Sequence, residues 1–70
     1  MDTVDSAPRL SPRHRQVLTL LAAGVQARGI AEQLGISEAT VRNHIKVILR
    51  RLDCHSQLEA VARAHEWQLV

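Results

Sequence analysis

The sequence predicts an all-α domain in which four short helices form a small bundle around a helix-turn-helix. Three observations favour this fold class: apolar residues recur at helical spacing, Trp67 is the single Phe, Tyr or Trp, and serines and glycines separate the periodic segments. With 70 residues, the chain has room for one domain near the lower size at which a hydrophobic core holds a fold. We assign residues 10–70 to that domain and residues 1–9, which lack periodicity, to a flexible leader or linker.

The first helix is expected to begin at Ser11 and Pro12, because serine caps free backbone amides and proline suits the first helical position. Gly24 is expected to end this helix. Its buried face is predicted from three apolar residues at helical spacing and a fourth that flanks them: Val17, Leu20, Leu21 and Leu18.

The second helix is short and is predicted over residues 27–34. Its core-facing residues recur at helical spacing: Ile30, Ala31 and Leu34. Gly35 then suits a turn, because glycine tolerates a positive φ. Ser37 follows as the cap of the next helix, so the two helices are joined by the tight, glycine-containing turn of a helix-turn-helix.

The third helix, predicted over residues 38–52, has the clearest pattern in the chain. Its inner stripe is apolar: Val41, Ile45, Ile48 and Leu52. Its outer side is polar and basic: Arg42, Asn43, Lys46 and Arg50. From Arg42 to Arg51 there are four cations and no acid, although the net charge of the whole chain is only +2. This cluster favours a polyanionic partner, and a helix with one anchored face and one basic face fits the DNA major groove.

The fourth helix is expected to run from a capping box at Ser56 and Glu59 to about Trp67, and it carries two apolar stripes. One stripe is predicted to face the core: Leu58, Val61 and Ala62. The other is predicted to form a homodimer interface: Ala60, Ala64 and Trp67. The alternative is that Trp67 folds back over the core of its own domain.

Six runs of residues share the order and spacing of a known family: 10–18 (LSPRHRQVL), 21–24 (LAAG), 30–37 (IAEQLGIS), 40–45 (TVRNHI), 48–52 (ILRRL) and 59–61 (EAV). With these runs, the chain from Leu10 to about Ala64 resembles the LuxR/GerE-type helix-turn-helix domain of bacterial transcription regulators. The resemblance implies a four-helix domain whose third helix reads DNA and whose fourth commonly supports dimerisation. It places the base-reading roles on Arg42, Asn43 and Lys46, which helical geometry also puts on the exposed first half of the third helix.

Other polar residues are placed for contacts with DNA phosphates: Thr40, His44 and Arg50 on the third helix, and Gln26 and Arg28 near the start of the second. The chain departs from the family pattern in the first turn of the first helix and at the start of the second helix. The acidic residues usual in the first turn of the first helix are replaced by His14 and Gln16, and residues 26–29 lack the usual Ser and Glu. The second departure weakens the expected phosphate anchor, while the expected fold is unaffected.

The sequence offers little for other kinds of chemistry. Cys54 is the single cysteine, which excludes an internal disulfide and fits a reducing cytoplasm. No apolar run approaches the roughly 18 residues that a membrane span needs. The histidines and Cys54 match no zinc-site spacing, and a chain this small leaves little room for a substrate cleft. We therefore expect no metal, no cofactor and no enzymatic activity.

These observations predict the DNA-binding domain of a transcription regulator, acting on duplex DNA as a homodimer with half-sites about one helical turn apart or closer. RNA polymerase is a candidate second partner. One alternative is a sigma-factor-like promoter-recognition domain, against which the well-formed helix after Asp53 argues. The other alternative is a non-enzymatic helical adaptor that binds protein. The chain fits both a piece of a larger regulator and a stand-alone domain that starts at Met1.

Overall fold

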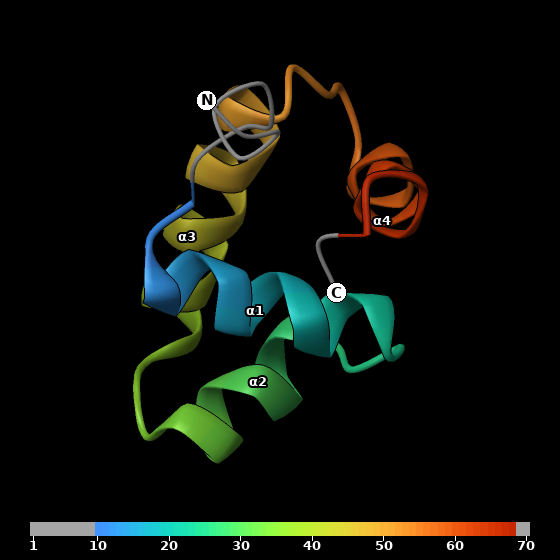
Figure 1. Ribbon diagram of the computed structural model, residues 1–70. Coiled ribbons are helices and arrows are strands. Elements are labelled where there is room, and N and C mark those ends of the chain that lie inside the picture. Colours follow the sequence, from blue (N-terminus) through green and yellow to red (C-terminus); the bar gives the residue numbers. More distant parts are fainter. Residues whose placement is uncertain (1–9, 69–70) are drawn as a thin grey trace.

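The computed structural model describes residues 10–68, which contain four α-helices: α1 (Pro12–Ala22), α2 (Ala27–Leu34), α3 (Glu38–Arg51) and α4 (Gln57–Glu66). The predicted all-α fold class is confirmed, and no strand occurs among these residues. Figure 1 shows α1 crossing in front of α3, with α2 below α1 and α4 to the right. The predicted leader, residues 1–9, lies outside the described residues. None of the four helices is long and apolar enough to cross a membrane.

Three of the helices begin at serine caps, as the sequence predicts. In each case the serine Oγ accepts a hydrogen bond from the backbone N–H three residues later: Ser11 from His14, Ser37 from Thr40 and Ser56 from Glu59. Such a cap satisfies one of the amide groups that the first turn of a helix leaves without a partner, and its removal costs about 1 kcal/mol. The caps therefore fix where α1, α3 and α4 start.

The turn between α2 and α3 has the geometry expected of a helix-turn-helix. Gly35 ends α2 with φ at 69°, a left-handed conformation that is strained for residues with a Cβ. The backbone N–H groups of Gly35 and Ile36 both donate to the carbonyl of Ala31. Ile36 packs against the core beneath the turn. Ser37 then caps α3 directly, so a tight turn joins α2 to α3.

The core receives residues from all four helices and from the α3–α4 connection: Val17, Leu18, Leu21, Ile30, Ala31, Val41, Ile45, Ile48, Leu52, Cys54, Ala60 and Ala64. The predicted inner stripe of α3 is confirmed in full. On α1, Leu18 is completely buried and Leu20 only partly, the reverse of the prediction. Because α1 contacts each of the other three helices, a wide arc of its surface is covered and includes Leu18.

The predicted orientation of α4 is wrong except at Val61, which packs against the core as predicted. Ala60 and Ala64 have 0% exposed surface in the core of the domain, so they are not available for the predicted dimer interface. Leu58, predicted to be in the core, is 81% exposed, and Ala62 is exposed beside it. The physical reason is that α4 packs against α1 and α3, and methyl side chains let helix axes approach more closely than leucine does.

Trp67 follows the last residue of α4 and is 39% exposed. The guanidinium of Arg63 lies over its ring, 5.4 Å from the centroid. This distance is within the range of a cation–π interaction. Trp67 therefore covers the guanidinium of Arg63 at the C-terminal end of α4.

Candidate nucleic-acid interface

Helix α3 divides into a buried side and an exposed side. Val41, Ile45 and Ile48 are buried against the other helices, and Leu52 is buried directly after the end of α3. The three residues predicted to read bases, Arg42, Asn43 and Lys46, are all exposed. At 100° per residue, these three positions span an arc of about 100° on the helix surface. The structure therefore brings them together on one side of the first half of α3.

Arg42 forms an ion pair within α3. Its Nη2 donates to Oε2 of Glu38, one turn earlier in the same helix. Glu38 has no assigned role in the sequence prediction, although its spacing of four residues from Arg42 is a signal that could have indicated the pair. The guanidinium that is predicted to contact DNA is therefore already restrained at one nitrogen.

Thr40, a predicted phosphate contact, takes part in two hydrogen bonds at the start of α3. Its backbone N–H donates to Ser37 Oγ at 3.0 Å, and its Oγ1 accepts a hydrogen bond from the Ser37 hydroxyl at 2.8 Å. Because the Ser37 hydroxyl supplies that hydrogen, the hydrogen of the Thr40 hydroxyl is left for another acceptor. Thr40 is exposed, so a phosphate oxygen can be that acceptor.

His44, another predicted phosphate contact, is only partly exposed, because it faces His14 of α1. The two rings meet edge to face with centroids 5.1 Å apart. His14 Nδ1 is buried and has no hydrogen-bond partner among the described residues. Burial lowers the pKa of His14, and the nearby His44 and Arg51 lower it further. The sequence alone does not indicate the contact of His14 with His44, because it joins two different helices.

The remaining predicted phosphate contacts lie on α3 and at the start of α2. Arg50 is exposed, and neither Arg50 nor Lys46 forms an ion pair with a residue in the range 10–68. Gln26 is the N-cap residue of α2 and its side chain makes no capping hydrogen bond. Arg28 is exposed and forms an ion pair with Glu32, one turn later in α2, in which Nε and Oε2 lie 4.0 Å apart.

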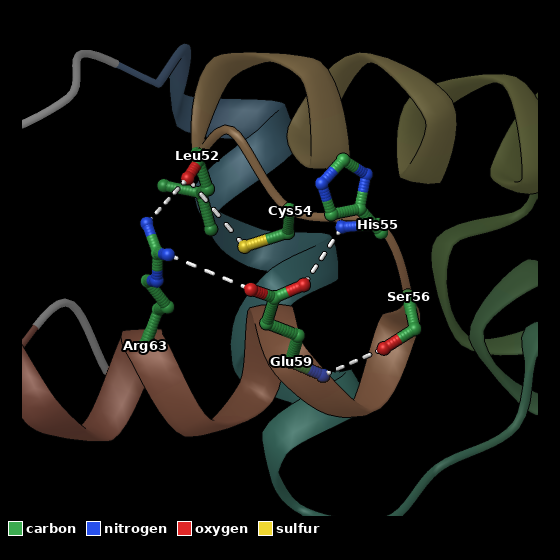
Figure 2. Close-up of polar contacts among 6 residues, drawn as sticks. All are labelled: Leu52, Cys54, His55, Ser56, Glu59 and Arg63. Atoms are coloured by element: carbon green, nitrogen blue, oxygen red, sulfur yellow. Dashed lines mark hydrogen bonds and ion pairs between the residues drawn. The ribbon is translucent and has the colours of Figure 1, made fainter.

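The connection from α3 to α4 is held by a compact set of hydrogen bonds (Figure 2). The carbonyl of Leu52 accepts from Arg63 Nη1 at 3.1 Å and from Cys54 Sγ at 3.5 Å. Glu59 Oε1 accepts from the backbone N–H of His55 at 2.8 Å, and its Oε2 lies 3.5 Å from Arg63 Nη2. The end of α3 is therefore attached to the middle of α4 by side chains as well as by the connection itself.

Cys54 lies in this connection and is buried as a free thiol. Burial raises the pKa of its thiol, while the positive charge of Arg63 acts in the opposite direction. Among the described residues, no three His, Cys, Asp or Glu side chains come together as metal ligands would. Cys54 acts here as a small apolar side chain of the core.

Comparison with known proteins assigns this arrangement to a family. A family model described as bacterial regulatory proteins, luxR family, matches residues 8–64. The chain belongs to the LuxR family. Its four helices form a DNA-binding helix-turn-helix domain of this family of transcription regulators.

Two curated relatives of this LuxR-family domain differ in length. The transcriptional regulatory protein DesR of Bacillus subtilis is 38% identical over 65 residues, which cover 93% of this chain and 33% of DesR. The spore germination protein GerE of the same organism is 41% identical over 56 residues, which cover 80% of this chain and 76% of GerE. The chain thus spans about a third of DesR and most of GerE.

Solved structures show the same arrangement of helices. The structure of the transcription factor GerE has a TM-score of 0.79 and 32% identity, covering 86% of this chain and 90% of that one. The response regulator ChrA of a heme-sensing two-component system has a TM-score of 0.82 and 34% identity, covering 93% of this chain and 33% of ChrA. The fold of this LuxR-family domain therefore occurs both in a short regulator and within a longer one.

Proposed function

We propose that this LuxR-family domain binds duplex DNA with sequence preference, with α3 in the major groove, as part of a transcription regulator. The supporting observation is that α3 buries one side in the core and presents Arg42, Asn43 and Lys46 to solvent from the other. A helix anchored in this way can enter the groove without a change of fold. RNA polymerase remains a predicted partner of such a regulator.

The exposed polar side chains suit two kinds of contact. Arg42 or Lys46 can donate to guanine O6 and N7, and Asn43 can pair with the N6 and N7 edge of adenine. The residues proposed to contact phosphates lie on α3 and near the start of α2: Thr40, His44, Arg50, Gln26 and Arg28. In this division the phosphate contacts provide most of the affinity, and the base contacts provide the sequence preference.

Selection of bound sequences from a pool of random duplex DNA tests this function. We expect one enriched motif. The logarithm of the affinity for that duplex should fall with the logarithm of the salt concentration, by about 0.9 for each phosphate contact. A helical adaptor that binds protein would show no enrichment. Negligible binding to every duplex at low salt would refute the proposed function.

We further propose that the domain forms a homodimer through the exposed side of α4. Leu58 is 81% exposed, and Ala62 is exposed one turn later in the helix. A two-fold axis would place these apolar side chains against their copies in a self-complementary contact. Trp67 lies nine residues after Leu58, about half a turn around the helix axis, and does not share this face.

Sedimentation equilibrium of the parent chain and of Leu58→Glu tests the dimer. We expect self-association of the parent chain to be lost in Leu58→Glu, because the interface would bury a carboxylate without a partner. Gln57→Glu is the matched control, since it adds the same charge at a neighbouring exposed position of α4. A parent chain that stays monomeric at every concentration and selects a motif without two-fold symmetry would refute the dimer.

A further inference from the structure

We infer that Glu38 is a specificity-determining residue, which positions the guanidinium of Arg42 for a base edge and keeps it from the phosphates. The inference rests on the proposed DNA binding by α3. It starts from the ion pair between Glu38 Oε2 and Arg42 Nη2, which lie on successive turns of the helix proposed to enter the groove. Glu38 is thus a positioning residue, because it acts on DNA recognition through Arg42.

The ion pair leaves Arg42 able to donate to DNA. A guanidinium has five N–H donors in a planar fork, and Glu38 engages Nη2. The remaining donors can reach two acceptors side by side, which is what the O6 and N7 atoms of guanine present in the major groove. A guanidinium restrained at one nitrogen samples fewer orientations than a free one, so less freedom is lost when the base contact forms.

Two features of α3 favour the pair before DNA arrives. Glu38 is the first residue of α3, where the positive end of the helix dipole favours a carboxylate. A glutamate four residues before an arginine has the more favourable order for such a pair on a helix. The Glu38 side chain is 41% exposed and that of Arg42 is 64% exposed, so both groups lie on the side of α3 that DNA would approach.

The carboxylate of Glu38 has a second effect, because it repels the phosphates of every duplex. This repulsion lowers the affinity for all sequences, whereas the restraint on Arg42 favours only those sequences that present two acceptors to it. Lys46 and Arg50 have no ion-pair partner within residues 10–68 and can turn to phosphates. Without Glu38, Arg42 would gain the same freedom. Glu38 therefore raises the ratio of affinities between preferred and random DNA.

The chain contains a matched control for this effect. Arg28 and Glu32 form a pair of the same residue types at the same spacing but in the opposite order on α2, where no base-reading residue is proposed. The side chain of Arg28 is 83% exposed and that of Glu32 is 73% exposed, and Arg28 Nε lies 4.0 Å from Glu32 Oε2. Glu32→Gln removes the same charge as Glu38→Gln and likewise frees an arginine. It should change the affinity for all duplexes without changing the ratio between them.

The experiment measures binding of the parent chain, Glu38→Gln and Glu32→Gln to two duplexes. One is the duplex most enriched from the random pool by the parent chain, and the other has the same bases in shuffled order. For Glu38→Gln we expect the ratio of the affinity for the enriched duplex to that for the shuffled duplex to fall by about five-fold or more, because the affinity for shuffled DNA rises. The slope of the logarithm of affinity against the logarithm of salt concentration should steepen by about 0.9, the amount expected for one more phosphate contact. Thermal unfolding of each variant shows that the domain remains folded.

A second comparison separates an effect through Arg42 from a direct effect of the charge. In an Arg42→Ala background, Glu38→Gln should leave the affinity ratio unchanged. An unchanged ratio in Glu38→Gln alone would overturn the inference, and so would an equal fall in Glu32→Gln or a fall that persists with Arg42→Ala. Sequence selection by the parent chain distinguishes these failures from failure of the proposed function. If the parent chain enriches no sequence, the proposed function and this inference both fail.

Discussion

The imidazole rings of His14 and His44 meet edge to face where α1 packs on α3, with their centroids 5.1 Å apart. His14 stands where the resemblance to LuxR/GerE-type domains implies an acidic residue, so one imidazole faces another here. His14 Nδ1 is buried without a hydrogen-bond partner in the described part of the chain. A proton on His14 would add positive charge beside His44 and Arg51, so the contact is stable with His14 neutral.

His14 makes the stability of the domain depend on pH. In the unfolded chain its pKa is near 6.5, and burial lowers it in the folded domain, so the unfolded chain takes up the proton first. The free energy of unfolding should therefore fall as the pH drops below about 6.5, until His14 also protonates in the folded state. Thermal unfolding at pH 7.5 and 5.5 should show a smaller loss of Tm in His14→Gln than in the parent chain.

His65→Gln is the control for this pH effect, because it removes an exposed histidine of α4. Its loss of Tm between pH 7.5 and 5.5 should match that of the parent chain. If His14→Gln and the parent chain lose Tm equally, His14 is not the group responsible.

Base contacts and phosphate contacts should respond differently to substitution. Lys46→Ala or Asn43→Ala should reduce discrimination between the enriched and shuffled duplexes by about 1–3 kcal/mol, because each removes a donor to a base edge. Arg50→Ala should weaken binding to both duplexes alike and reduce the salt dependence by about one phosphate contact. Fluorescence anisotropy titrations at several salt concentrations measure both quantities. Equal effects of all three substitutions on both duplexes would refute the assignment of base contacts.

The orientation of α4 can be tested through its alanines. Ala64 is completely buried and Ala62 is exposed on the other side of the helix. Ala64→Leu should reduce the free energy of unfolding by about 1–3 kcal/mol, because three further heavy atoms must fit into a filled core. Ala62→Leu should change it little. Urea unfolding measures both variants, and a greater loss in Ala62→Leu would show that the opposite stripe faces the core.

Arg63 should contribute more to stability than an arginine of a surface ion pair. Arg63→Met keeps the aliphatic stem and removes the hydrogen bond to the Leu52 carbonyl, at an expected cost of about 1–3 kcal/mol in the free energy of unfolding. Arg28→Met breaks only the exposed pair with Glu32 and should cost less. Urea unfolding of the two variants decides the comparison, and equal losses would mean that the α3–α4 hydrogen bonds contribute little.

Most of the fold could be predicted from local sequence signals. Serine caps and the glycine turn depend on residues within four positions of one another, and the stripe of α3 depends on apolar residues that recur every three or four positions. The structure has all of them. The side of α4 that faces the core could not be predicted in the same way. Both of its stripes are apolar. Whether the stripe with Ala60 or the stripe with Leu58 faces the core depends on how closely α4 can approach α1.

The same distinction applies to the candidate interface. The exposure of Arg42, Asn43 and Lys46 follows from helical periodicity. The four-residue spacing of Glu38 and Arg42 is enough to predict their ion pair. The contact of His14 with His44 and the hydrogen bond from Arg63 to Leu52 join different helices. They depend on helix crossing angles, which no local pattern of residues specifies.

The hydrogen bonds that attach Arg63 and Glu59 to the connection before α4 bear on the DNA sites that a dimer could use. In a dimer built on α4, each α3 would stand at a fixed distance and angle from the two-fold axis. One base pair inserted between two half-sites moves them apart by about 3.4 Å and rotates them by about a tenth of a turn. An attached α3 cannot follow that displacement, so this protein would accept one spacing of half-sites and reject its neighbours.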